Sequence, residues 1–222
     1  MTSAAATLRA IIVVQAVLIS GSSYAAEQVE FSIYGGLQSI GDSQVSGNDP
    51  GGTGIFNFVT GWPNRPGGAL SQFGLRLTVW QNSTFGWGMD FNSYAARADQ
   101  STLGSNGISA LELSNGINIL TINAYRRWQD IGIISPYVGA GVGVAIPTIK
   151  FDSGTGRTSQ LQLTGPAMQW VAGASIPVGN GVSVFGEYQG SYTVYTANLI
   201  GGGSFSTNLR RSTVNFGLSL GF

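Results

Sequence analysis

The last nine residues of the chain alternate strictly between large apolar side chains and small or polar ones. Successive side chains of a β-strand point to opposite faces, so a period of two predicts a strand with one apolar face. Val214, Phe216, Leu218, Leu220 and Phe222 form that face, with Asn215, Gly217, Ser219 and Gly221 between them. This pattern favours a sheet over a helix and makes the opposite faces chemically different.

The same alternation recurs along most of the chain. We expect further strands at about 29–38, 72–79, 85–92, 116–127, 138–146, 168–176 and 182–194. The segment 116–127 is ambiguous, because apolar residues occur on both of its faces. There we assign Leu120, Ile122 and Ala124 to the outer face, since Thr121 and Asn123 then point inward with the other polar residues.

Composition indicates which face meets solvent. Only 9% of the residues are charged, against about 25% in an ordinary soluble domain. The polar faces carry mainly Gly, Ser and Asn, which suit a narrow interior, whereas the apolar faces are too bulky for one. We therefore predict an all-β, eight-stranded antiparallel transmembrane β-barrel with its apolar face against lipid. The alternative is a soluble lipocalin-like barrel, which would point its apolar face inward.

The connections alternate between short and long. Short ones are expected at 81–83, 128–135 and 177–181, and long ones at roughly 39–69, 98–114, 150–160 and 197–208. Short periplasmic turns and longer outer loops are the usual layout of bacterial transmembrane barrels. The barrel domain is expected over residues 26–222.

Residues 1–25 resemble a signal peptide. Arg9 precedes an apolar run, Ala10 to Ile19, and small residues follow up to Ala25. That run is about half the length of a spanning helix. We expect cleavage after Ala25, export, and insertion into the outer membrane of a bacterial cell.

Several classes of chemistry are excluded by residue counts. The chain has no cysteine and no histidine, which rules out thiolate nucleophiles, zinc–thiolate sites and any mechanism with a histidine base. Formal net charge is zero, so no basic footprint suggests nucleic acid. No cofactor is evident from the sequence.

Five charged residues fall on the inward faces of the expected strands. They are Glu30, Arg76, Asp90, Glu187 and Arg211. Buried charges must pair or be hydrogen-bonded, so we expect an ion-pair network that fills the lumen. Gly139, Gly141 and Gly143 would leave room for Tyr34 or Arg76 to cross. The alternative is an active-site acid pair or an ion path.

Some segments resemble known families. Pro136 to Gly143 resembles the small OmpA/Opa-type outer-membrane barrels. Phe31–Gly36, Gly74–Arg76, Gly88–Asn92, Leu163–Pro166, Gln169–Gly173, Val184–Tyr188 and Gly201–Gly203 are similar to rhizobial lipid A oxidase-like barrels. The second resemblance implies oxidation of the proximal glucosamine of lipid A to an aminogluconate unit, with oxygen and a divalent metal. The chain departs from that family at Asn57, Pro63 and Ser93, where the family carries two acids and a histidine.

Three functions follow as hypotheses. The first is a non-enzymatic outer-membrane barrel that supports the envelope or presents loops. The second is a lipid A-modifying enzyme, with Asp90 and Glu187 as the candidate catalytic residues. The third is a small channel, although eight strands leave little open lumen. Expected partners are outer-membrane lipid, lipopolysaccharide and, through Phe222, the barrel-assembly machinery. The barrel is expected to be a monomer.

Overall fold

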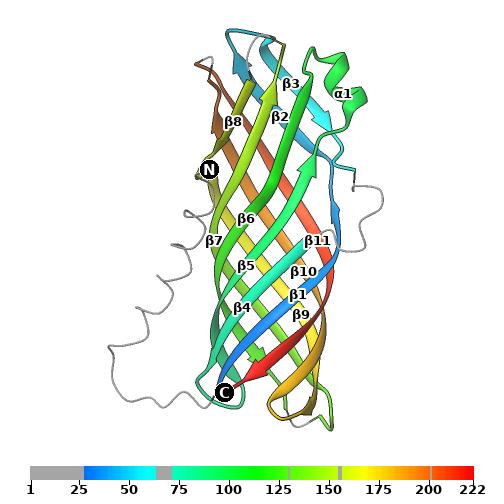
Figure 1. The fold of residues 1–222 in the computed structure, drawn as a ribbon, viewed down its shortest axis with the longest axis vertical. Helices are drawn as coiled ribbons and strands as arrows, with labels where there is room; N and C mark the ends of the chain where they lie inside the picture. The colour runs from blue at the N-terminus through cyan, green and yellow to red at the C-terminus, as the bar shows by residue number, and fades with distance from the viewer. Residues whose placement is uncertain (1–27, 64–71, 130, 155–156, 201) are drawn as a thin grey trace, which may run out of the picture.

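The computed structural model describes residues 28–63, 72–129, 131–154, 157–200 and 202–222. They form a tall cylinder of antiparallel strands (Figure 1). Eight strands make the ring: β1 (Gln28–Ile40), β4 (Gln72–Trp80), β5 (Phe85–Arg97), β6 (Ala110–Arg127), β7 (Ser135–Asp152), β9 (Gly165–Gly179), β10 (Val182–Asn198) and β11 (Ser204–Gly221). Pairing of β1 with β11 closes it.

Three further strands lie outside the ring order. They are β2 (Ser43–Asp49), β3 (Gly54–Thr60) and β8 (Arg157–Leu161). The hairpin of β2 and β3 pairs with β11, and β8 pairs with β7. The ring thus has the expected eight strands, but the described chain forms eleven. The expected signal peptide, residues 1–25, lies outside the described residues.

The pairing register fixes the tilt of the strands. Following the paired residues once around the ring, a path that starts at Phe31 of β1 returns at Gly41, ten residues further on and directly after the end of β1. It passes through Leu77, Met89, Ile122, Val142, Met168, Tyr192 and Arg210. A stagger of this kind forces the strands to tilt by about 35–45°.

The two ends of the cylinder differ. The terminal end holds Gln28 and Phe222, and short turns connect its strands (Figure 1). One of these turns has positive φ at Asn180 and Gly181, 52° and 75°, as a two-residue hairpin turn requires. Phe222 donates its backbone N–H to Val29 at 2.8 Å and so fastens the last strand to β1.

An exposed apolar belt surrounds the half of the cylinder nearer the terminal end. Each of the eight ring strands contributes at least one large apolar side chain that is more than one-third exposed. Phe31, Ile33, Phe73, Trp87, Met89, Ile122, Val142, Met168, Trp170, Val184, Phe216 and Leu218 are among them. The outward placement of Leu120, Ile122 and Ala124 is confirmed. A contiguous apolar surface of this extent does not face water in a soluble monomer.

Towards the opposite, distal end the inner face changes its chemistry. Inner positions become apolar and buried, whereas outer positions are mixed: Gln44, Asn48 and Asn57 are exposed there, and so are Ile55 and Val59. The inner set includes Val45, Phe56, Phe58, Leu111, Leu113, Ile117, Ile149, Phe151, Phe205 and Leu209. We call this part, made of β2, β3, β8, α1 (Gln100–Ser105) and the adjoining ends of the ring strands, the distal extension.

The distal extension corrects the expectation of long loops. The expected loop 39–69 contains β2 and β3, and 98–114 contains α1 and the start of β6. Likewise 150–160 contains the end of β7 and part of β8. These segments fold because their apolar side chains point inward and bury one another. The expectation that every apolar face meets lipid did not allow for this arrangement.

A single short helix, α1, belongs to the described chain. The Asp99 side chain caps it by accepting a hydrogen bond from the Thr102 backbone N–H at 3.2 Å. Hydrogen bonds from the Ser101 side chain and the Thr102 backbone hold the pKa of the Asp99 carboxyl below its usual value. Within the described ranges, no helix is long and apolar enough to cross a membrane.

Candidate functional site

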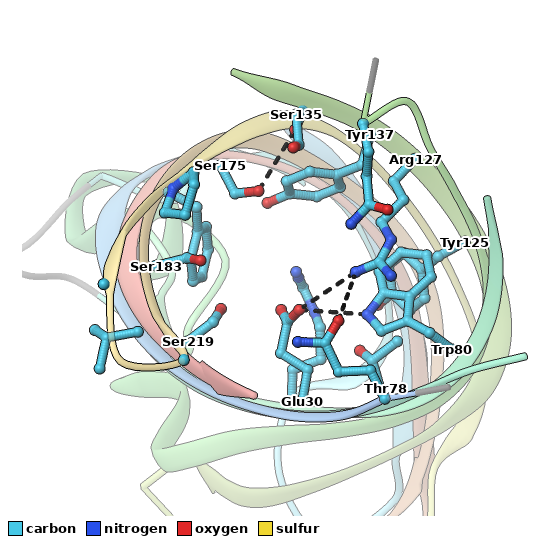
Figure 2. Close-up of a pocket in the computed structure, with 18 residues that line it drawn as sticks. Glu30, Thr78, Trp80, Tyr125, Arg127, Ser135, Tyr137, Ser175, Ser183 and Ser219 are labelled. Atoms are coloured by element: carbon cyan, nitrogen blue, oxygen red, sulfur yellow. Dashed lines mark hydrogen bonds and ion pairs between the residues drawn. The ribbon is translucent and has the colours of Figure 1, made fainter. Parts of the chain in front are cut away.

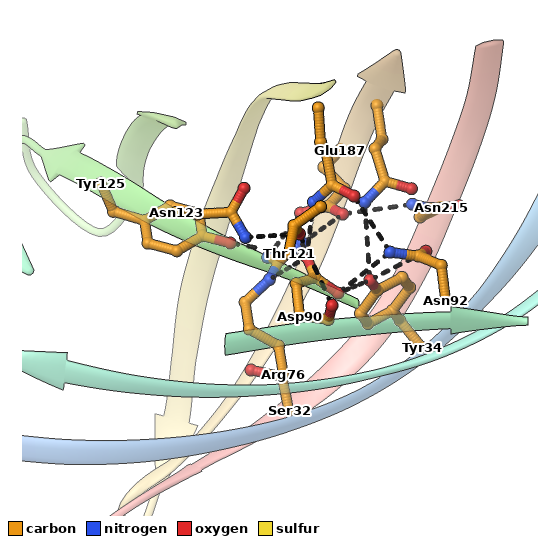
Figure 3. A network of polar contacts seen from close by, with 12 residues as sticks. Ser32, Tyr34, Arg76, Asp90, Asn92, Thr121, Asn123, Tyr125, Glu187 and Asn215 are labelled. Carbon is orange, nitrogen blue, oxygen red and sulfur yellow. Dashed lines mark hydrogen bonds and ion pairs between the residues drawn. The ribbon is translucent and has the colours of Figure 1, made fainter. Parts of the chain in front are cut away.

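The centre of the barrel interior holds a buried arginine between two buried carboxylates. Arg76 on β4 bonds both oxygens of Glu187 on β10, each at 2.8 Å. It also donates to Asp90 on β5 at 3.0 Å. The three side chains are 5% exposed or less. The bidentate contact crosses the lumen, because β4 and β10 are three strands apart in the ring (Figure 3).

Tyrosines and amides satisfy the remaining oxygens of the two acids. Tyr137 donates its hydroxyl to Glu187 at 2.5 Å, and Asn215 donates to the same carboxylate at 3.1 Å. The Tyr34 hydroxyl bonds Asp90, and Gln169 donates to it at 2.8 Å. We call Arg76, Asp90, Glu187 and these four partners the central cluster. Each buried charge in it has opposite charge and hydrogen bonds around it, which offsets the cost of burial.

Aromatic rings surround the Arg76 guanidinium as well. Its central carbon lies 5.0 Å from the ring centre of Tyr34 and 5.3 Å from that of Tyr125. Inward glycines provide the space for these rings. A Cβ atom at Gly139 would lie 2.5 Å from Tyr125. Gly139 therefore leaves room for a large side chain, as expected. That side chain is Tyr125 of the neighbouring strand β6, and not Tyr34 or Arg76.

Arg211 contradicts the expectation that every interior charge pairs with an opposite one. It is 2% exposed, yet among the described residues no carboxylate lies within ion-pair distance of it. Instead it donates to Gln189 at 3.0 Å and Ser191 at 3.2 Å, and it also bonds Gln72. Its guanidinium carbon sits 4.1 Å from the ring centre of Tyr94. Neutral acceptors and an aromatic face replace the expected acid.

Glu30 lies apart from the central cluster, near the terminal end. It is partly exposed, and its carboxylate accepts a hydrogen bond from the Trp80 indole at 3.3 Å. The Arg127 guanidinium lies 4.0 Å away and stacks on Trp80 at 3.8 Å. Arg127 was missed by the sequence analysis, because it follows Arg126 at the end of a strand whose faces were ambiguous. Continuing the inward set of Thr121 and Asn123 by steps of two would have found it.

Between the central cluster and the distal extension, two tyrosines meet across the full width of the lumen. The hydroxyls of Tyr94 on β5 and Tyr195 on β10 are 3.2 Å apart. These strands are four apart in either direction around the ring, hence directly opposite. Further on, the ring of Phe151 stacks between Phe56 and Phe205, with centroids 5.7 and 6.0 Å away. Side chains thus bridge the interior at three successive levels.

This interior offers few groups for covalent chemistry. Asp90 and Glu187, the candidate catalytic acids, are both bonded to Arg76 and buried. Among the residues placed by the structure, no group of three or more acids, histidines or cysteines comes together to hold a metal ion. Of the positions where the chain departs from the oxidase-like family, Asn57 is exposed in β3 and bonds Gln44, far from the central cluster in the fold.

No family model matches the chain, and no curated protein matches it. Several solved structures are similar in fold. One is Neisserial surface protein A, at 11% identity and a TM-score of 0.49, covering 90% of this chain and 99% of the other. Outer membrane protein AlkL shows 17% identity and a TM-score of 0.49, covering 92% and 94%. OprG of Pseudomonas aeruginosa shows 13% identity and a TM-score of 0.48, covering 88% and 95%. The likeness to these structures concerns the fold alone.

Proposed function

We propose that this chain is an integral outer-membrane barrel that holds a folded distal extension outside the cell, and that it acts neither as an enzyme nor as a channel. The observation that carries the proposal is the exchange of faces along the cylinder. Large apolar side chains face outward around the belt and mainly inward in the distal extension, where Ile55 and Val59 of β3 are exposed exceptions. The first arrangement suits lipid, and the second suits water.

The edges of the belt support this placement. Near the terminal end, the exposed Arg126 lies 5.4 Å from the ring of Phe85 and 5.1 Å from that of Trp128. Near the distal extension, Arg210 lies 6.0 Å from the ring of Tyr192. Aromatic and basic side chains are typical of membrane–water interfaces. In this placement, the partners would be lipid around the belt and lipopolysaccharide at the edge near Arg210.

The bridged interior favours a closed barrel over a channel. Arg76 with Glu187, Tyr94 with Tyr195, and Phe151 with its neighbours all join different sides of the lumen. Asp90 and Glu187 support an enzyme poorly, because both already bind Arg76 inside the barrel.

Two measurements on the folded protein test the proposal. An affinity tag inserted between Gly51 and Gly52, in the turn from β2 to β3, should be detected by antibody on intact cells. The purified barrel in planar lipid bilayers should show no steady conductance. A tag that becomes accessible only after lysis would refute the orientation, and steady single-channel steps would favour the channel. Lipid A that gains one oxygen when the gene is expressed would favour the enzyme.

A further inference from the structure

The terminal end of the barrel opens into a cavity of about 220 Å³. Side chains from β1, β4, β6, β7, β9, β10 and β11 line it, together with residues of the short turns. Figure 2 shows Trp80, Tyr137 and the serines around its centre. Arg76 and Tyr137 belong both to this lining and to the central cluster, so the cluster borders the cavity.

The polar groups around this cavity are mostly neutral. Ser135, Ser175 and Ser183 present partly exposed hydroxyl groups on three neighbouring strands. The two charged groups of the rim, Glu30 and Arg127, have opposite sign and lie 4.0 Å apart. Arg76, the third charged lining residue, is paired with Asp90 and Glu187. Each charged lining group thus has an opposite charge beside it, which does not favour a charged ligand. A neutral ligand with several hydroxyls would find both donors and acceptors.

Apolar groups form the rest of the wall. Trp80, Tyr137 and Phe185, which are all largely buried, line the cavity as well. Pockets that combine apolar walls with a few directed polar groups are typical of small-molecule sites. Such sites measure about 300–1,000 Å³ for drug-sized ligands, so a cavity of about 220 Å³ suits a smaller molecule.

We propose that this cavity binds a single neutral sugar ring. A pyranose combines C–H groups, which pack against aromatic side chains, with hydroxyls around its rim, which match the serines. If the orientation proposed above holds, the cavity opens to the periplasm, where free sugars and the ends of glycan chains are two sources of the same chemistry. The binding itself does not depend on that orientation.

Fluorine NMR of the folded full chain, labelled with fluorotryptophan, tests the proposal. Trp80 lines the cavity, whereas Trp170 lies exposed in the belt. Titration with glucose or N-acetylglucosamine should shift the Trp80 signal to saturation and leave Trp170 unchanged. Glycine, a zwitterion, and inorganic phosphate, an anion, serve as comparisons, and a short oligomer of N-acetylglucosamine separates chain ends from free sugars. Tighter binding of the oligomer would indicate the glycan as the source.

A filled cavity provides the decisive variant. Ser183→Phe, or Ser175→Phe if the first fails to fold, should raise the dissociation constant for the sugar at least about tenfold. Ser159→Phe, on an exposed position of β8, should leave it unchanged. Folding of each variant is checked by gel mobility before titration. The proposal is overturned if neither sugar gives a saturable shift, if only glycine or phosphate does, or if both folded cavity variants bind as the parent does.

Discussion

At the scale of single residues, the two buried arginines solve the same problem in different ways. Arg76 is compensated by two carboxylates, whereas Arg211 is held by amide and hydroxyl oxygens and by the Tyr94 ring. The charges of Arg76, Arg211, Asp90 and Glu187 sum to zero. Both carboxylates nevertheless contact Arg76, and neither forms an ion pair with Arg211. The consequence is that the two arginines should respond differently to mutation.

Replacing Arg76 by methionine should lower the free energy of unfolding by about 3–5 kcal/mol, because two buried carboxylates then lose their partner. Arg211→Met should cost clearly less, since Gln72 and Gln189 are neutral and can bond each other. Lys150→Ala, at a partly exposed outer position, is the control and should have little effect. Urea unfolding in lipid vesicles, followed by gel mobility, measures all three. Equal losses for Arg76 and Arg211 would contradict this account.

The capping residue Asp99 makes α1 sensitive to pH. Its pKa is lowered in the folded state, so its contribution to stability is present above the unfolded value of about 4 and is lost as the pH falls through the folded pKa. Protection of the Leu103 amide, whose N–H bonds the Asp99 backbone carbonyl at 3.1 Å, should fall in acid once the exchange rate is corrected for its intrinsic pH dependence. Asp99→Asn retains a capping oxygen without a charge and should remove this dependence. A pH response that persists in Asp99→Asn would have another cause.

At the scale of elements, β11 illustrates how one strand serves two environments. Val214, Phe216 and Leu218 point outward at even positions, and Phe205 and Leu209 point inward at odd positions. Because the pairing of β10 with β11 contains no register shift, the faces themselves do not change. The switch of apolar residues from one parity to the other therefore marks the edge of the membrane.

Charge substitutions on β11 should reveal this edge. Phe216 lies near the middle of the outward apolar run and is 67% exposed. Phe216→Arg should destabilise the inserted barrel by roughly 2–4 kcal/mol, the cost of an arginine near the bilayer midplane. Ser206→Arg, on the same face of the strand but in the distal extension, should be nearly neutral. Folding titrations in vesicles compare the two variants, and similar costs would refute the proposed edge.

At the scale of the whole molecule, one cylinder contains two cores. The central cluster fills the membrane part with polar groups, and the distal extension is filled with apolar ones. Phe151 links strands that are far apart in sequence by stacking on Phe56 and Phe205. We expect the second core to open without unfolding of the first.

Phe151→Ala should destabilise the distal extension by about 3–5 kcal/mol, as for other buried phenylalanines. Hydrogen exchange should then become faster in β2, β3 and β8, while β1 and β4 stay protected. The gel mobility of the unboiled barrel should not change. Faster exchange throughout the ring would show instead that the two cores unfold together.

Many features of this protein follow directly from its amino-acid pattern. Period-two alternation was sufficient for the ring strands, for the apolar belt and for the inward placement of Arg76, Asp90 and Glu187, because alternation reports the face of each residue. The sequence of β11 also shows the change of apolar residues from odd to even positions. Because all apolar faces were assigned to lipid, this change was not recognised, and the distal extension was expected to form loops.

The contacts between inward residues, in contrast, depend on the closed ring. Arg76 reaches Glu187, and Tyr94 reaches Tyr195, because ring closure and a stagger of ten residues bring distant strands to the same level. The same geometry leaves Arg211 among amides and places Arg127 beside Glu30. Alternation along one strand predicts whether a side chain points inward or outward, but it does not predict which residue that side chain contacts. Contacts across the lumen depend on the register of all eight ring strands.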